Sequence, residues 1–213
     1  SLEDTMLPEN PDTSAKIDLF KKLEFKQLLE QIDVDGTHST AEEKELNVES
    51  DFKNIDFKSL TSATIHFELD GSNYLKDDIL KFALFADEHH VVVDAANIHD
   101  YPELIAWLED DTTEKNVYDA KKTYIVAHRL KISISNIIFD VMLASYIIDP
   151  SRAIDDVNSV VSNYGQHYVQ QSVEVYGKGK KRHLPEDDVL NHYVATVIEA
   201  INQVKPIMQE QLI

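Results

Sequence analysis

Residues 61–94 read TSATIHFELDGSNYLKDDILKFALFADEHHVVVD and decide the fold class of the chain. Apolar and polar residues alternate over 61–70, which is typical of a strand that buries one face. Two further strands are predicted over Ile79–Ala86 and His89–Asp94. Only two residues separate them, so the chain must reverse in a tight hairpin with antiparallel strands. The stretch therefore predicts a three-strand meander.

Strands and helices alternate downstream of the meander. A short strand is predicted over Asn116–Tyr118 and a helix over Asp119–Leu130. A second alternating stretch, Ile132–Ile138, predicts a strand, and the apolar run Val141–Ile148 predicts a helix. The last helix is predicted over Glu186–Val204. A meander followed by such alternation predicts an α/β fold with a mixed sheet flanked by helices.

The first 60 residues differ in composition from the rest. An amphipathic pattern predicts a helix over residues 14–32, and residues 33–58 are acidic and poor in large apolar side chains. We therefore predict an N-terminal arm with an acidic linker over residues 1–60 and a folded domain over residues 61–213.

Composition excludes several classes of protein. The chain has 39 acidic and 20 basic residues and a formal net charge of −19, whereas a free-standing nucleic-acid binder needs a basic surface. It has no cysteine, which excludes disulfides, thiolate nucleophiles and cysteine-based zinc sites. No apolar run approaches the roughly 20 residues of a membrane span. A cytoplasmic protein without membrane partners is expected.

Four carboxylates are candidates for metal chemistry. Glu68 and Asp70 are two residues apart on a predicted strand and so share a face, where they could hold Mg²⁺ for phosphoryl chemistry. The structural alternative is a solvated strand face that ends in a turn. Asp119 and Asp140 each precede a predicted helix, where an aspartate is either a metal ligand or an N-cap.

Three further sets of residues have both a functional and a structural interpretation. Three strand histidines could ligate a transition metal or be ordinary strand residues: His66, His89 and His90. Three tyrosines could stack on nucleic-acid bases or pack in the domain: Tyr164, Tyr168 and Tyr176. One basic cluster could contact a phosphate or form a solvated loop: Lys178, Lys180, Lys181 and Arg182.

Two stretches resemble the 3′–5′ exonuclease domain of bacterial family A DNA polymerases, the DNA polymerase I family. ISISNIIFDVMLASYII (132–148) is similar to the family run GIxxxGxxFDTMLxSYxL, and VYGKGKKR (175–182) is similar to its GKGK loop. LFKKLEFKQLLEQI (19–32) is similar to the segment that joins the 5′ nuclease to this domain. The resemblance implies a ribonuclease H-like fold, a mixed five-stranded sheet flanked by helices. It also implies a parent chain with a polymerase module and a 5′ nuclease, acting in DNA replication and repair.

Active members of this family hold two Mg²⁺ ions with four carboxylates. These lie in a D-x-E motif on the first strand, an N-x-K-[FY]-D motif entering a helix, and a Y-x3-D motif on the last helix. On this sequence the first motif falls on His66 and Glu68, and the aspartate of the second falls on Thr123. The third falls on Thr196 or Val197, according to register. Glu68 is the one carboxylate that remains.

One carboxylate cannot hold two hard cations that each need several oxygen ligands. The resemblance therefore implies a vestigial exonuclease domain of the Gram-positive type, without catalytic residues, metal or other cofactor, that supports the polymerase module. We expect DNA to be bound through the parent protein and weakly or not at all by this chain. The alternative is an active exonuclease that has recruited replacement ligands: Glu68, Asp70, Asp119 and Asp140.

Overall fold

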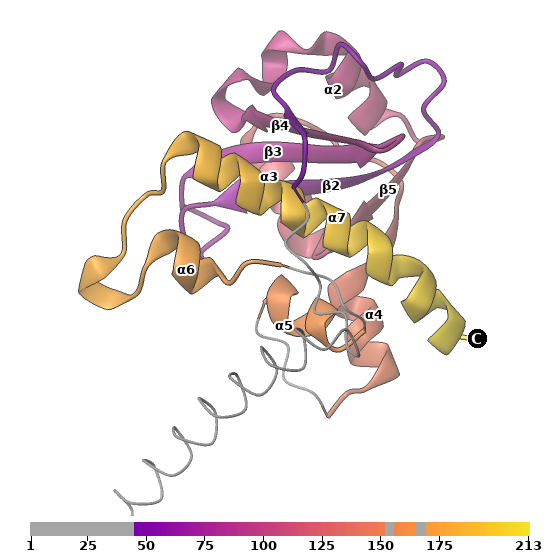
Figure 1. Ribbon diagram of the computed structural model, residues 1–213. Helices are drawn as coiled ribbons and strands as arrows, with labels where there is room; N and C mark the ends of the chain where they lie inside the picture. Colours follow the sequence, from indigo (N-terminus) through magenta and orange to yellow (C-terminus); the bar gives the residue numbers. More distant parts are fainter. Residues whose placement is uncertain (1–44, 152–155, 165–168) are drawn as a thin grey trace, which may run out of the picture. The chain divides into compact units, whose positions relative to one another are not determined.

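The computed structural model describes residues 45–151, 156–164 and 169–213 (Figure 1). These residues belong to one compact unit, Glu43–Ile213. The strands are β1 (Val48–Glu49), β2 (Ser62–Leu69), β3 (Ile79–Ala86), β4 (His89–Asp94), β5 (Glu114–Val117) and β6 (Ile137–Asp140). The α-helices are α2 (Pro102–Glu109), α3 (Ala120–Arg129), α4 (Val141–Ile148), α5 (Val157–Ser162), α6 (Ser172–Tyr176) and α7 (Asp187–Gln211). Two 3₁₀ helices are η2 (Ala95–Asp100) and η3 (Gly179–Lys181). The helix predicted over 14–32 lies outside the described residues.

The strands form one six-stranded mixed sheet in the order β1-β4-β3-β2-β5-β6. Strands β2, β3 and β4 are the predicted antiparallel meander. The turn between β3 and β4 has two residues with positive φ, Asp87 at 50° and Glu88 at 65°, as a two-residue hairpin turn requires. Strand β5 pairs parallel with β2, and β6 pairs parallel with β5. The predicted α/β fold with a mixed sheet is confirmed.

The sheet has six strands rather than the predicted five, because residues before position 60 take part in it. Strand β1 pairs parallel with β4, with Val48 opposite His90. Further along, Phe52, Ile55 and Leu60 are buried, and the indole Nε1 of Trp107 donates a 2.8 Å hydrogen bond to the carbonyl oxygen of Leu60. Residues 48–60 therefore contribute a strand and buried side chains to the folded unit, before the predicted boundary at residue 60.

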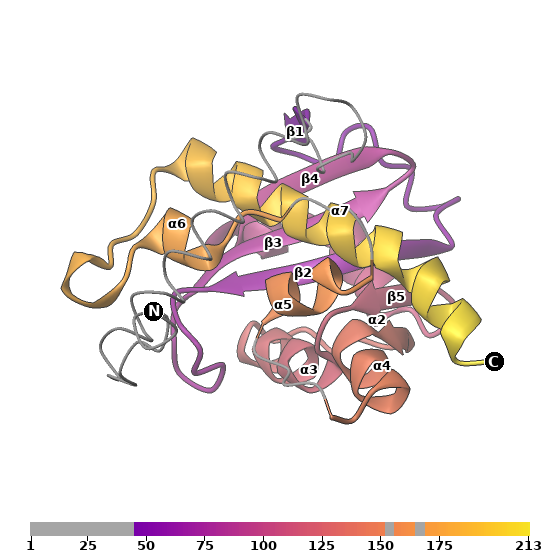
Figure 2. The same ribbon diagram turned by 60° about the horizontal axis from the view of Figure 1, so that its bottom comes forward.

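Helices cover both faces of the sheet (Figures 1 and 2). Ile65 and Phe67 of β2 pack in an apolar core with residues of α2 and α3. The other core contains residues of α4, α5, α6 and α7, and α7 crosses that face obliquely (Figure 2). Because side chains alternate along a strand, His66 and Glu68 point toward the α7 face. None of the helices among the described residues is long and apolar enough to cross a membrane.

Two predicted elements have different bounds in the structure. The strand predicted over Ile132–Ile138 begins only at Ile137, because the backbone N–H of Ser135 donates to the carbonyl of Leu108 in α2 and Asn136 has a positive φ of 63°. Helix α7 continues beyond the predicted end to Gln211, with Pro206 inside it. A proline there removes one helix hydrogen bond, and packing of the surrounding residues maintains the helix.

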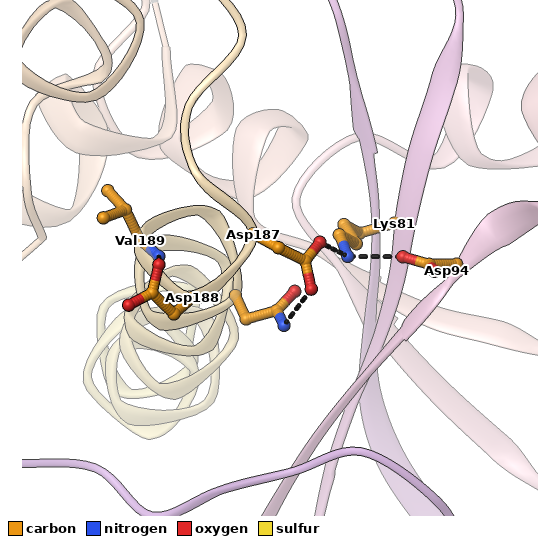
Figure 3. Close-up of polar contacts among 6 residues, drawn as sticks. Lys81, Asp94, Asp187, Asp188 and Val189 are labelled. Carbon is orange, nitrogen blue, oxygen red and sulfur yellow. Dashed lines mark hydrogen bonds and ion pairs between the residues drawn. The ribbon is translucent and has the colours of Figure 1, made fainter.

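A buried lysine fixes the start of α7 on the sheet (Figure 3). The ammonium group of Lys81, in β3, forms ion pairs with Asp94 at the end of β4 and Asp187 at the start of α7. Burial alone would lower the pKa of Lys81, but hydrogen bonds and charge from the two carboxylates outweigh it and raise that pKa. The lysine therefore stays charged and joins three elements of the fold.

Candidate nuclease site

Glu68 has a hydrogen-bond partner at each of its two carboxylate oxygens. The phenol of Tyr176, from α6, donates to Glu68 Oε1 over 3.0 Å. The imidazole Nε2 of His66 lies 3.0 Å from Glu68 Oε2. Because a carboxylate can only accept, Nε2 carries the proton of that bond. Both oxygens of the Glu68 carboxylate are therefore bonded to side chains of the domain itself.

The two donors to Glu68 are kept neutral by their surroundings. Burial lowers the pKa of His66, more than the hydrogen bond and charge of Glu68 raise it, and the nearby charge of Lys122 lowers it further. Burial raises the pKa of Tyr176 far above its ordinary value, and the charge of Glu68 adds to that effect. At neutral pH an uncharged imidazole and a protonated phenol therefore hold Glu68.

A cleft of about 310 Å³ opens beside Glu68. Its charged lining residues are Glu68, Asp156 and Arg182. Nη2 of Arg182 lies 2.6 Å from Oδ1 of Asp70, and its guanidinium carbon lies 5.2 Å from the ring centroid of Tyr176. The cation of this cleft is thus paired with one carboxylate and lies near two more. Such a balance of charge is unfavourable for a phosphate.

Thr123 lies beside His66, as the resemblance implies, but its hydroxyl is used within its own helix. Thr123 Oγ1 donates to the carbonyl oxygen of Asp119 over 2.6 Å. Thr123 and His66 line a pocket of only about 10 Å³, which is room for about one water molecule. Thr196 is buried in α7, where its hydroxyl donates to the carbonyl oxygen of Tyr193 over 2.6 Å. Both threonine hydroxyls therefore bond to backbone carbonyls and not to the space beside Glu68.

The remaining candidate ligands act as helix caps. Asp119 accepts from the backbone N–H of Lys122 at 3.1 Å and so caps α3. Asp140 accepts from the N–H of Leu143 at 3.1 Å, which caps α4, and from the N–H of Ala120 at 2.9 Å. Within the part of the chain that the structure describes, no three His, Asp or Glu side chains form a group that could hold a metal ion. The donor set therefore does not fit a pair of Mg²⁺ ions.

The other candidates from the sequence are dispersed in the structure. His89 Nδ1 lies 2.6 Å from a carboxylate oxygen of Glu49, and His90 packs on Phe85 with ring centroids 4.7 Å apart. Tyr164 is buried in the core on the α7 face, and Tyr168 lies outside the described residues. All four residues of the basic cluster are exposed: Lys178, Lys180, Lys181 and Arg182.

Sequence reasoning missed the partners of Glu68 and Asp70. Tyr176 and Glu68 are 108 positions apart, so their hydrogen bond leaves no periodic signal in the sequence. Arg182 was grouped with the exposed lysines, although it pairs with Asp70. The position of Tyr176 directly before the GKGK stretch was the one local indication that it borders the site.

A mixed sheet of this order with helices on both faces defines a ribonuclease H-like domain. The structure of Brucella melitensis NrnC bound to pGG has this fold, with a TM-score of 0.63, 15% sequence identity, and coverage of 79% of this chain and 82% of that one.

The sequence profile described as "DNA polymerase I, ribonuclease H-like domain" matches residues 65–204, so the chain belongs to this family. DNA polymerase I of Bacillus subtilis (strain 168) is 30% identical over 205 residues, covering 92% of this chain and 22% of that protein. A Mycobacterium smegmatis structure described as the POL domain of Pol1 with DNA primer-template and dNTP matches with a TM-score of 0.54 and 15% identity, over 72% of this chain and 24% of that one. The chain thus spans about a quarter of the length of its relatives.

Proposed function

We propose that this chain is a structural domain of a DNA polymerase I and has no 3′–5′ exonuclease activity of its own. The observation that carries the proposal is the bonding of Glu68, whose two oxygens accept from Tyr176 and His66 at 3.0 Å each. A carboxylate in this state is a structural acceptor rather than an open metal ligand.

The chemistry of phosphodiester hydrolysis supports the same conclusion. Two-metal hydrolysis uses one cation to activate water and another to stabilise the leaving oxygen, and both need several oxygen ligands. Thr123 and Thr196 direct their hydroxyl groups to backbone carbonyls within their own helices. With Glu68 as the one remaining acid of the family motifs, the residues present do not supply either cation with its ligands.

The proposed partners belong to one parent chain. The relatives are DNA polymerase I proteins of which this chain covers 22% to 24%. We propose that the parent carries a polymerase module and a 5′ nuclease, acts in DNA replication and repair in the cytoplasm, and contacts DNA mainly outside this domain. The net charge of −19 supports a minor role for this domain in DNA contact.

A nuclease assay with a matched variant tests the proposal. Purified chain is incubated with 5′-labelled single-stranded DNA and Mg²⁺ or Mn²⁺, and the labelled strand is expected to keep its length. Glu68→Ala, prepared in parallel, measures any contaminating nuclease. Metal-dependent shortening by the unsubstituted chain that disappears in Glu68→Ala would overturn the proposal.

The second candidate is an active exonuclease that uses Glu68, Asp70, Asp119 and Asp140. Its supporting observation is that Glu68 and Asp70 lie two residues apart at the end of β2. The ion pair of Asp70 with Arg182 and the capping bonds of Asp119 and Asp140 count against it. This candidate predicts that Asp70→Asn abolishes metal-dependent cleavage as fully as Glu68→Ala does.

A further inference from the structure

A pocket lies on the α2 face of the sheet, the face opposite to the one toward which Glu68 points. Its volume is about 210 Å³. The residues that precede β2 contribute Phe57 and Lys58 to its lining. Helix α2 and the residue that follows it contribute the rest of the lining: Glu103, Ala106, Trp107 and Asp110. None of these residues belongs to the candidate nuclease site, so this α2 pocket is a separate feature of the domain.

Two aromatic rings form the floor of the α2 pocket. Trp107 is 3% exposed and Phe57 is half-buried, and their ring centroids lie 6.3 Å apart at an interplanar angle of 50°. The indole is held in place, because its Nε1 donates to the carbonyl oxygen of Leu60 over 2.8 Å. Ala106 is exposed and has only a methyl group, so it leaves room beside the rings. The floor therefore offers a fixed aromatic surface to a ligand.

The rim of the α2 pocket is mainly acidic. Glu103 and Asp110 are both exposed, and their spacing of seven residues places them on one face of the helix. Oδ1 of Asp110 accepts from the backbone N–H of Thr112 at 2.8 Å and from its hydroxyl at 2.7 Å. These hydrogen bonds lower the pKa of Asp110, so this carboxylate is charged at neutral pH. Lys58 is the one cation among the lining residues.

We infer that the α2 pocket binds the guanidinium group of an arginine on a basic segment of a partner protein. A guanidinium is planar and weakly hydrated, so it stacks on aromatic rings, and Glu103 and Asp110 accept its N–H groups. An aliphatic or aromatic side chain would contact the floor but would take water from two carboxylates without pairing them. The ammonium group of a lysine is more strongly hydrated and stacks less well on the rings.

The charge around the pocket is complementary to such a segment. Four carboxylates lie on α2 and in the turn that follows it: Glu103, Glu109, Asp110 and Asp111. Two cations oppose them, Lys58 at the rim and the buried Lys115, whose Nζ lies 5.0 Å from the centroid of the Trp107 ring. The local balance stays negative, as does the formal net charge of the chain, −19. A basic segment is therefore attracted to this surface before its arginine enters the pocket.

The single tryptophan of the chain makes the inference directly testable. The indole N–H resonance of Trp107 is followed by NMR in the ¹⁵N-labelled chain while the peptide acetyl-Gly-Arg-Gly-amide is added. The resonance is expected to shift and to saturate. The same peptide with citrulline, a neutral isostere, in place of arginine is expected to leave it unmoved. Glu103→Gln and Asp110→Asn should each weaken binding about two- to fivefold, the range of an exposed ion pair.

Two further variants separate the pocket from general attraction to an acidic surface. Asp111→Asn is the matched control, because it removes the same charge at an exposed neighbouring position outside the lining, and binding should be unchanged. Ala106→Leu fills the pocket at an exposed helix position without changing the charge, and should abolish the shift while the melting temperature is kept.

Three results would each overturn the inference. These are a shift that grows linearly without saturating, an equal response to the citrulline peptide, and an equal loss of binding in Asp111→Asn and Asp110→Asn. None of these measurements involves nuclease activity or Glu68, so they are independent of the proposed function.

Discussion

Arg182 and Asp70 form an ion pair in which Nη2 lies 2.6 Å from Oδ1. The same guanidinium lies over the ring of Tyr176, 5.2 Å from its centroid. Arg182, one cation of the basic cluster, therefore contacts residues around the candidate site. Lys178, Lys180 and Lys181 are exposed, as Arg182 is, so the ion pair and not burial distinguishes Arg182 from the three lysines. The four basic residues are expected to behave differently when they are replaced.

DNA binding separates these two roles. The chain is expected to bind single-stranded DNA with a Kd at or weaker than roughly 10⁻⁴–10⁻⁶ M, the range of non-specific binding. Replacing the three lysines by glutamine should remove the residual binding and its salt dependence, whereas Arg182→Gln should mainly lower stability. Fluorescence anisotropy at several salt concentrations measures the first effect and urea denaturation the second. Sub-micromolar binding that is lost with the lysines would show a true phosphate site.

Replacing Glu68 tests the hydrogen-bond network directly. Glu68→Ala is expected to lower the free energy of unfolding by about 1–3 kcal/mol, because the phenol of Tyr176 and the N–H of His66 lose their acceptor while buried. Tyr176→Phe is the partner for a double-mutant cycle, in which the two losses should be less than additive. Additive losses in urea denaturation would mean that the 3.0 Å contact contributes no coupling energy.

The neutral state of His66 makes stability depend on mildly acidic pH. Burial lowers its pKa in the folded chain below the ordinary 6.5, so the unfolded chain binds more protons in this range. Stability is therefore fully present above about pH 6.5 and is lost as the pH falls toward the folded pKa. The urea midpoints measured at pH 7.5 and at pH 5.5 should differ less in His66→Gln than in the unsubstituted chain. An unchanged difference would assign the acid sensitivity to other groups.

Lys115 makes the stability of the chain depend on mildly alkaline pH. It is fully buried, and its ammonium group donates to the carbonyl oxygens of Asp110 at 2.8 Å and Thr113 at 2.9 Å. Burial lowers the pKa of Lys115 from 10.5 to about 8. The unfolded chain then binds more protons between these values, so stability should rise with pH across this window, by about 3 kcal/mol at most.

The measurement for Lys115 compares two proteins over pH 7.5–9, below the ordinary tyrosine pKa of about 10. In Lys115→Met the free energy of unfolding should rise less with pH, and unfolding should remain cooperative. If the free energy of unfolding of the unsubstituted chain is constant over this range, the lowered pKa of Lys115 is contradicted.

The sequence predicted what depends on local pattern. Alternation and a two-residue turn predicted the meander. The family resemblance placed His66 and Thr123 at motif positions, and the structure brings both to one small pocket. Strand β1 was missed because two residues carry no periodicity. The start of β6 was displaced because Asn136 takes a positive φ, which alternation of side chains does not reveal.

The partners of the site residues could not be predicted for a different reason. Tyr176 reaches Glu68, and Asp187 reaches Lys81, across more than a hundred positions each. Such pairs depend on where α6 and α7 pack on the sheet, and packing is a property of the whole core. The sequence thus indicated Glu68 as a candidate site residue, but not that Tyr176 and His66 are its hydrogen-bond partners.

The bonding of Glu68 also bears on how this domain can evolve. A lineage that changed His66 to aspartate would replace a hydrogen-bond donor by a second carboxylate next to Glu68, and the two would repel one another in a buried site. Thr123 and Thr196 would still need their own changes, each at a buried position. Every intermediate along this path would be less stable before any of them gained a metal ion. Under the proposed function, selection for a stable fold therefore works against the return of catalysis, one substitution at a time.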